Sequence, residues 1–307
     1  MTNETYAVVL NWRNAEDTIR CLRSILSQSS PPTRVLCVDN GSGDGSAERI
    51  SNACGAVDLV CLDSNLGFAA GNNRGISRAI NAGAQFVWLL NNDAVAAPNC
   101  LENMVRAAET QPDVAAVGSV ILDYEAPNRL QEWGGGRFDP LLGRCLAHRK
   151  PVPPARLGYI TGASLLLRVE ALRALGLLDE SFFLYGEDVE LGQRLRRAGW
   201  RLDVAHQALV WHKRGVSTSS ERKEYYLNMA AVRLQKAYAP VAPLMAVCGT
   251  VSRVLRFAAR NDWRRAAAAA SGAWAGWQAK DVGSGVPAAP QSASGPCASA
   301  PSVAETP

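Results

Sequence analysis

The feature that most constrains the fold is a repeated alternation of short apolar runs with helical patterns over residues 1–97. After the first run, Ile19, Leu22 and Ile25 recur at the spacing of an amphipathic helix. Strands that alternate with helices form parallel sheets with right-handed crossovers. The sequence therefore predicts an α/β fold that begins with a doubly wound sheet. The predicted strands are YAVVLNW (6–12), RVLCVDN (34–40), DLVCLDS (58–64) and QFVWLLNND (85–93).

Polar side chains stand at the end of all these predicted strands. Asn and Asp are common turn formers, so any one of these stretches alone fits an ordinary turn. Open α/β sheets, however, bind ligands outside the carboxyl ends of their strands. Polar residues at the ends of successive strands therefore favour a ligand pocket along this edge. The residues are Asn11, Asp39, Asn40, Asn65, Asn91, Asn92 and Asp93.

Two glycine-containing loops are candidates for nucleotide binding. In VDNGSGDGS (38–46), Asp39 could accept hydrogen bonds from a base or a ribose; a strand-to-helix turn explains the loop equally well. In NLGFAAGNNRGI (65–76), Gly67 opens a predicted helix, with Asn72 and Arg74 behind it. Free N–H groups at a helix start together with an arginine suit a diphosphate, although an ordinary helix entry has the same pattern.

Asp93 is a candidate metal ligand. Hard cations such as Mg²⁺ and Mn²⁺ bind through one or two carboxylates and complete their shell with water and substrate phosphate. His212, in ALVWHKRG, ends another apolar run and is the candidate second ligand. A histidine at a strand end is also frequently structural, and this stretch alone leaves both interpretations open.

Three carboxylates follow an aromatic loop in SFFLYGEDVELGQRL. Glu187, Asp188 and Glu190 fall in the first turn of a predicted helix, where the helix dipole favours negative charge. The preceding aromatic residues, which include Tyr185, indicate a cleft, and a carboxylate at a cleft could deprotonate a hydroxyl group. Burial would raise the pKa of such a carboxyl and the helix start would lower it.

The order of these motifs over residues 6–218 resembles that of the inverting family 2 glycosyltransferases, and especially of their rhamnosyltransferase-like branch. The resemblance implies a GT-A fold, a Rossmann-like mixed sheet flanked by helices. It places the catalytic domain at residues 1–218, with a nucleotide-sugar-binding half at about 1–97 and an acceptor-binding half at 98–218.

The resemblance also assigns roles to residues. Asp188, with Glu187 beside it, looks like the catalytic base of a Glu-Asp motif. Asp93 and His212 look like ligands of Mg²⁺ or Mn²⁺; Asn91 replaces the first Asp of the family's Asp-x-Asp motif, which puts metal dependence in question. The implied donor-binding residues are Asn11, Asp39, Asn40, Asn65, Gly67, Asn72, Arg74, Asn91 and Asn92, and the implied acceptor region contains Trp133, Gly162, Ala163 and Tyr185.

The implied reaction is a single displacement that inverts the anomeric carbon. The first candidate donor is dTDP-rhamnose, with UDP-hexoses or UDP-galactofuranose as alternatives, and the acceptor is a glycan on a polyprenyl diphosphate. Met229 and Ala230 stand where relatives often have Arg-Asn, which should affect packing or acceptor contacts. A protein that binds nucleotide sugars without turnover and a nucleotidyltransferase are the rivals. The latter needs a glycine-rich loop after the first strand, and NWRNAEDTI contains no glycine.

The C-terminal part reads as a helical extension (219–280) followed by a disordered tail rich in Ala, Pro and Ser (281–307). Between Arg253 and Arg265 there are five arginines and one aspartate, next to an apolar helical face. This extension either contacts the surface of a membrane or packs on the catalytic domain.

Composition narrows the function class further. The net charge of +4 is too small to indicate nucleic-acid binding. The eight cysteines include no Cys-x-x-Cys pair, which favours free thiols in a reducing compartment. No signal-peptide pattern and no membrane span is evident, so we expect a cytoplasmic protein, with peripheral contact to the inner face of the plasma membrane as an added option.

Overall fold

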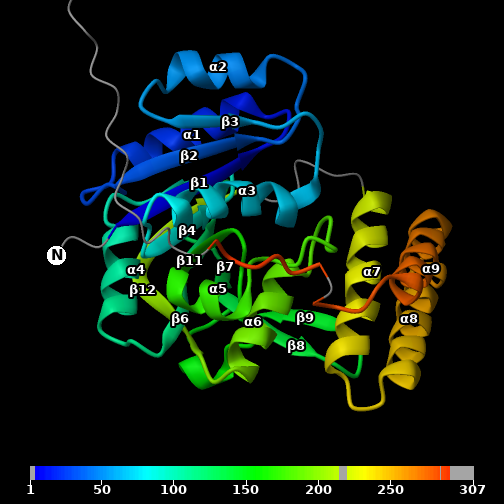
Figure 1. Ribbon diagram of the computed structural model, residues 1–307. Helices are drawn as coiled ribbons and strands as arrows, with labels where there is room; N and C mark the ends of the chain where they lie inside the picture. Colours follow the sequence, from blue (N-terminus) through cyan, green and yellow to red (C-terminus); the bar gives the residue numbers. More distant parts are fainter. Residues whose placement is uncertain (1–3, 214–219, 284, 291–307) are drawn as a thin grey trace, which may run out of the picture.

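The computed structural model describes residues 4–213, 220–283 and 285–290. The predicted strands form parallel neighbours in the order β3-β2-β1-β4, as a doubly wound sheet requires (Figure 1). Each strand begins and ends within a few residues of its predicted range, because the apolar runs that define them are local. The strands are β1 (Thr5–Asn11), β2 (Arg34–Asp39), β3 (Asp58–Cys61) and β4 (Phe86–Leu90).

The second half of the chain extends this sheet with strands of mixed direction. β11 (Ser164–Arg168) lies antiparallel between β4 and β6 (Val114–Asp123), and β12 (Arg201–His212) runs parallel to β6. The short β5 (Ala94–Ala96) pairs antiparallel with the end of β12, so that His212 stands opposite Ala94. The pairing of β5 with β12 thus places His212, which is distant in sequence, next to the end of β4.

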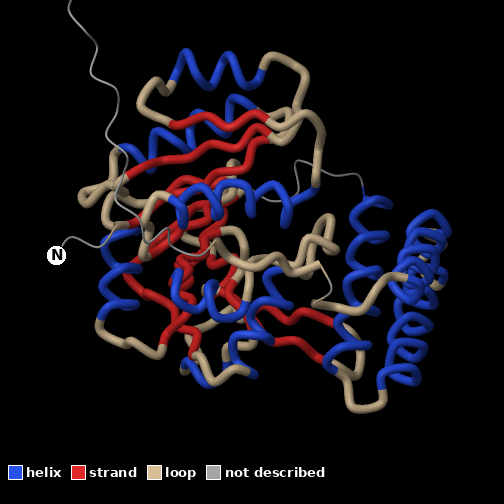
Figure 2. The backbone as a smooth tube through the Cα atoms, in the orientation of Figure 1, coloured by secondary structure: helices blue, strands red, loops and turns tan. Residues whose placement is uncertain are grey.

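Helices cover both faces of the sheet, and Figure 2 shows the strands between them. The side chains of a strand alternate between its faces, so Trp88 packs on one side and Val87 and Leu89 on the other. The side chains of α1, α2 and α4 pack in the first of these cores, and those of α3, α5 and α6 in the second. The helices are α1 (Ala15–Leu26), α2 (Ser46–Ala53), α3 (Gly67–Asn81), α4 (Cys100–Glu109), α5 (Val169–Leu175) and α6 (Glu187–Arg197).

The stretch between β6 and β11 forms the edge strand β7 (Leu130–Trp133) and a small second sheet. β7 pairs with β6, while β8 (Gly135–Asp139) lies between β9 (Arg144–Ala147) and β10 (Tyr159–Ile160), and one 3₁₀ turn (Pro154–Arg156) precedes β10. The cysteines of the described part are free thiols: Cys21, Cys37, Cys54 and Cys100 are buried, whereas Cys61, Cys145 and Cys248 are exposed.

Three helices follow at one end of the molecule (Figure 1): α7 (Ser220–Tyr238), α8 (Ala242–Ala258) and α9 (Trp263–Gln278). The predicted boundary at residue 218 falls among residues 214–219, outside the described part, and the domain division stays a prediction. α7 packs against the rest of the chain, where Arg233 donates to Ser181 through two nitrogens. No helix in the described ranges is both long and apolar enough to cross a membrane.

The predicted disorder of the tail from residue 281 on is wrong for its first part. Gly283 donates through its N–H to Asp179 Oδ2 (2.7 Å), and Leu177 and Glu180 donate backbone N–H groups to Pro287 and Gly285. Ala289 is buried in the core beside α5 and α6. Composition alone missed this strap, residues 282–283 and 285–290, because its contacts are made mainly by backbone. Residues 291–307 lie outside the described part.

Candidate active site

The ends of β1 and β2 hold a buried polar pair. Asn11 stands opposite Asp39 in the parallel register, and Asn11 Nδ2 donates to Asp39 Oδ1 at 2.6 Å. Ser42 donates to the same carboxylate through its N–H and its hydroxyl, and Thr18 donates to Asn11 Oδ1. The predicted pair is therefore assembled, and Ser42 and Thr18, which the sequence did not single out, hold it in place.

Asn40 and Asn65 fasten the loops after β2 and β3 to each other. Asn40 Nδ2 donates to Asn65 Oδ1 (3.1 Å) and to the carbonyl of Gly67 (3.0 Å), while Asn65 accepts the N–H of Gly67. Gly67 has φ = +86°, and a Cβ there would lie 2.4 Å from the carbonyl oxygen of Phe183. The start of α3 is thus packed directly against the loop that precedes α6.

Asn72 and Arg74 are placed differently from the rest of the predicted donor site. Asn72 is buried and donates to Phe68 O within α3, which is a structural contact. Arg74 is exposed on the same helix. Asn73 accepts the N–H of Leu178 and donates to its carbonyl, so it ties α3 to the segment before the catalytic motif.

The polar end of β4 meets the end of β12. Asp93 Oδ1 lies 3.1 Å from His212 Nε2, and both side chains are largely buried. Asn91 Nδ2 lies 3.4 Å from the same ring nitrogen. Asn92 turns the other way and donates to Thr18 Oγ1 at 3.0 Å. Through Thr18, the Asn91–Asp93 turn is linked to the Asn11–Asp39 pair in one hydrogen-bond network.

The orientation of the His212 ring is set by a residue that sequence reasoning missed. Gln131 Oε1 lies 2.9 Å from His212 Nδ1, and Gln131 Nε2 donates to the backbone carbonyl of His212. An amide oxygen beside Nδ1 favours the tautomer that carries its proton there, which leaves the lone pair of Nε2 available to a cation. No local signal marks Gln131, because its partner is 81 residues away in the chain.

The loop between β10 and β11 joins the two halves of the site. The N–H of Gly162 donates to Asp188 Oδ2 at 3.0 Å, and the next residue, Ala163, accepts the N–H of Asn91 through its carbonyl. Two consecutive residues of one loop therefore contact the predicted base and the predicted metal motif. Both had been predicted only as part of the acceptor region.

Asp188 and Glu187 form an acidic pair at the start of α6, in which Glu187 is buried and Asp188 is half-buried. Burial raises the pKa of Asp188, and the N–H donors of Gly162 and Val189 act against that rise. Burial, and then the charge of Asp188, raise the pKa of Glu187 to about 8. Within the described residues Glu187 Oε2 has no hydrogen-bond partner. Burial and the neighbouring charge therefore favour the neutral form of Glu187 at neutral pH.

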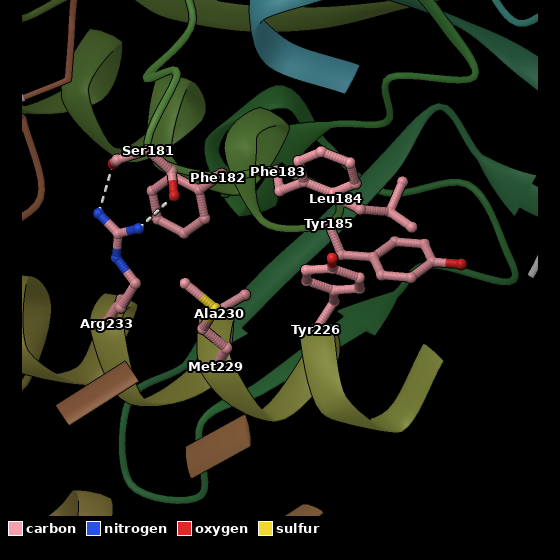
Figure 3. A pocket seen from close by; sticks show the side chains of 9 residues that line it. All are labelled: Ser181, Phe182, Phe183, Leu184, Tyr185, Tyr226, Met229, Ala230 and Arg233. Carbon is pink, nitrogen blue, oxygen red and sulfur yellow. Dashed lines mark hydrogen bonds between the residues drawn. The ribbon is translucent and has the colours of Figure 1, made fainter. Parts of the chain in front are cut away.

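An aromatic pocket lies beside this pair, between the loop 181–185 and α7 (Figure 3). The rings of Phe183 and Tyr226 stack with centroids 5.3 Å apart, and Arg233 lies over the ring of Phe182. Tyr185, predicted in the acceptor region, lines the pocket with φ = +67°. Trp133 lies on β7, the strand that also carries Gln131, and is not among the lining residues.

The donor atoms at the end of β4 fit a divalent cation of the Mg²⁺ or Mn²⁺ class. An aspartate oxygen and an imidazole nitrogen 3.1 Å apart, both on the edge beside the nucleotide loops, supply two ligands. Within the described residues no group of three or more His, Cys, Asp or Glu side chains forms a metal site. The rest of the coordination shell would have to come from substrate phosphate and water.

Comparison with known proteins decides the family. The model of the family described as "Glycosyltransferase like family 2" matches residues 3–233. The chain belongs to family 2 of the glycosyltransferases. It is accordingly a transferase, as the order of its motifs predicted.

Two relatives of this family 2 glycosyltransferase come from Mycobacterium tuberculosis. An N-acetylglucosaminyl-diphospho-decaprenol L-rhamnosyltransferase is 30% identical over 244 residues, which cover 72% of this chain and 80% of the relative. A galactofuranosyltransferase is 26% identical over 226 residues, which cover 70% of this chain and 72% of the relative.

Solved structures confirm the GT-A fold. A mannosyltransferase of Pyrobaculum calidifontis in complex with GDP-Man and Mn²⁺ has a TM-score of 0.57 at 15% identity, covering 90% of this chain and 87% of the other. GalNAc-T7 with UDP, GalNAc and Mn²⁺ has a TM-score of 0.62 at 16% identity and covers 84% of this chain; the match spans half (50%) of that protein.

Proposed function

We propose that this enzyme transfers a sugar, L-rhamnose from dTDP-rhamnose, to a hydroxyl group of a lipid-linked glycan with inversion of the anomeric carbon. The observation that supports this most is the loop at residues 162–163. Gly162 donates to Asp188 and Ala163 accepts from Asn91, so one loop contacts both the half-buried Asp188 carboxylate and the turn that carries Asp93.

In the proposed reaction the acceptor hydroxyl loses its proton to Asp188 and its oxygen attacks the anomeric carbon. The bond from that carbon to the nucleoside diphosphate breaks in the same step. Because the pKa of Asp188 is raised by burial, the carboxylate is a stronger base than an exposed aspartate. Two backbone N–H donors favour its ionised form and orient it.

A divalent cation, Mg²⁺ or Mn²⁺, would be held by Asp93 and His212 and would neutralise charge on the leaving diphosphate. Gln131 would keep Nε2 of His212 available to it. The replacement of an aspartate by Asn91 leaves one carboxylate in this motif, so we expect weaker metal binding than two carboxylates would give.

For the nucleotide, we propose that Asp39 and Asn11 contact the base and ribose and that the Asn40–Asn65–Gly67 loops shape the pocket. Arg74 is exposed, and it could contact the diphosphate only if the donor lies over α3. We assign Asn72 a structural role within α3. Trp133, Gly162, Ala163 and Tyr185 remain the proposed acceptor side.

The choice of rhamnose and of a lipid diphosphate acceptor follows the rhamnosyltransferase relative at 30% identity. The galactofuranosyltransferase relative at 26% identity makes UDP-galactofuranose the second candidate donor, and UDP-hexoses the third. A binding protein without turnover is disfavoured by the intact Asp93, His212 and Asp188.

The decisive experiment is a donor screen with the purified chain and Mn²⁺ or Mg²⁺. dTDP-rhamnose, UDP-galactofuranose and UDP-hexoses are compared for binding and for release of nucleoside diphosphate. Asp188→Asn should keep donor binding and slow release by about a hundredfold or more, because general-base catalysis contributes on that order. Asp113→Asn, an exposed carboxylate paired with Arg201, is the matched control.

Tight binding of a UDP-sugar alone would replace the donor and keep the enzyme class. Release of pyrophosphate would instead make the protein a nucleotidyltransferase. Undiminished turnover by Asp188→Asn would rule that residue out as the base.

A further inference from the structure

The C-terminal helices expose a continuous apolar surface. Large apolar side chains recur on α8 at spacings of three and four residues, which places them on one face of the helix. On α9 three tryptophans follow the same rule, with Ala267 and Ala270 between them. The apolar outer face consists of Leu244, Val247, Val251, Leu255, Trp263, Trp274 and Trp277, which are 42 to 65% exposed.

This surface is not an unfinished part of the core. α8 turns its opposite side, with Gly249 and Arg253, toward α7 and the turn before β9, and α9 turns Gly272 and Gly276 toward the backbone of α7. Both helices thus use their inner sides for packing and direct the apolar stripes away from α7. Of the eleven large apolar side chains exposed in the described residues, seven belong to this face. Such concentration marks an interaction surface.

The charges around this face indicate which kind of partner it binds. Residues 242–280 contain six basic side chains and one acidic one, Asp262. Asp262 caps α9 and pairs with Arg265, while Arg256, Arg260 and Arg264 are exposed at the end where the two helices meet. A second copy of this face would offer these arginines no acidic partner. The phosphates of anionic lipids would meet the arginines, while the headgroup–acyl boundary takes up tryptophan and leucine side chains.

We propose that the apolar outer face of α8 and α9 binds the surface of an anionic bilayer, with the tryptophans and leucines inserted at the headgroup level and Arg256, Arg260 and Arg264 on lipid phosphates. α7 lies between this face and the loop 181–185. The stacked rings of Phe183 and Tyr226 and the hydrogen bond from Arg233 to Ser181 join α7 to that loop. Binding to a membrane would help catalysis only if the acceptor is lipid-linked, as proposed above. The binding to the bilayer does not depend on that proposed function.

The test is co-sedimentation of the purified full chain with vesicles of phosphatidylcholine alone or mixed with phosphatidylglycerol. We expect binding to the anionic vesicles that weakens with added salt, since the arginine contribution is screened. Trp263→Ser combined with Trp274→Ser should lower the partition coefficient at least about tenfold. Arg260→Gln combined with Arg264→Gln should weaken binding to the anionic vesicles only.

Leu141→Ser, equally exposed at 58% but outside the face, and Arg149→Gln are the matched controls and should bind as the unmodified chain does. All these positions are exposed or on the outer face, so we expect the melting temperatures to be unchanged. Their measurement verifies that each variant is folded. Nucleoside diphosphate release in solution is measured in parallel, so that loss of catalysis and loss of vesicle binding are separate readouts.

Failure of the unmodified chain to bind either vesicle overturns the proposal, as does full binding by the tryptophan double variant. The unmodified chain could instead form a dimer in sedimentation velocity and bind no vesicles, with the tryptophan double variant remaining a monomer. That result would assign the face to a second copy of this chain and would also overturn the proposal.

Discussion

At the scale of single residues, the site is built from side chains held by partners from distant parts of the chain. Asn11, Asp39, Asp93 and Asp188 could be proposed from the sequence because each ends a strand run or begins a helix. The residues that hold them could not, because nothing in the local sequence marks Gln131 or Ser42 as the partner of a particular side chain. Their roles follow only from contacts that the fold creates.

Gln131 provides a direct test of this arrangement. Gln131→Ala should weaken Mn²⁺ binding about 10- to 100-fold, since partners that orient a ligating histidine contribute on that scale. Titration of Mn²⁺ by calorimetry measures it in the absence of turnover. Gln111→Ala, which removes an amide that bonds to Asp203 elsewhere in the molecule, should leave the affinity unchanged. Equal metal affinity in the two variants would mean that the His212 ring is held by other contacts.

Glu187 makes stability depend on pH. Its pKa is raised to about 8 in the folded chain, above that of an unfolded glutamate near 4.3, so the stabilisation is complete at low pH and is lost as pH rises through 8. Over that window the cost is about 1.4 kcal/mol per pH unit at most. Glu187→Gln should flatten the profile between pH 5 and 8 in urea unfolding. Parallel profiles for both proteins would show that Glu187 ionises normally.

At the scale of elements, α3 contacts the loop that precedes α6 at one glycine, Gly67. Gly67→Ala should lower the melting temperature and slow turnover, because the new Cβ would lie 2.4 Å from Phe183 O in addition to the strain of φ = +86°. Gly83→Ala is the matched control, since Gly83 has φ = +93° and open space around it. Its cost should be the backbone strain alone, about 1–2 kcal/mol. If thermal unfolding gives the same loss for both, the contact with Phe183 is unimportant.

The elements themselves followed from local pattern more than from long-range pairing. The four parallel strands of the first half were predictable because each is an apolar run bounded by polar residues and alternates with a helix, whereas their order β3-β2-β1-β4 came from the fold. The antiparallel insertion of β11 between β4 and β6 was not, because strand order in the second half depends on non-local hydrogen bonds. For the same reason the polar contacts of Gly162 and Ala163 became visible only in the fold.

At the scale of the whole molecule, the strap (residues 282–283 and 285–290) leads from α9 to the loop that precedes α6. Ending the chain at residue 281 should lower the melting temperature by several degrees, because Asp179, fully buried, loses the N–H of Gly283, and the core loses Ala289. Ending it at residue 290 keeps these contacts and should leave the melting temperature unchanged. Equal melting temperatures for both truncations would show that the strap contributes nothing to stability.

The pairing of β5 with β12 also governs when the enzyme becomes competent during its synthesis. Asn91 and His212 Nε2 are neighbours in space but 121 residues apart in the chain. The loops proposed to bind the nucleotide leave the ribosome early, yet the proposed cation site lacks its imidazole until β12 has followed. On the proposed assignment, a nascent chain that stops short of that strand lacks one ligand of the cation, and we expect activity only after the sheet has closed.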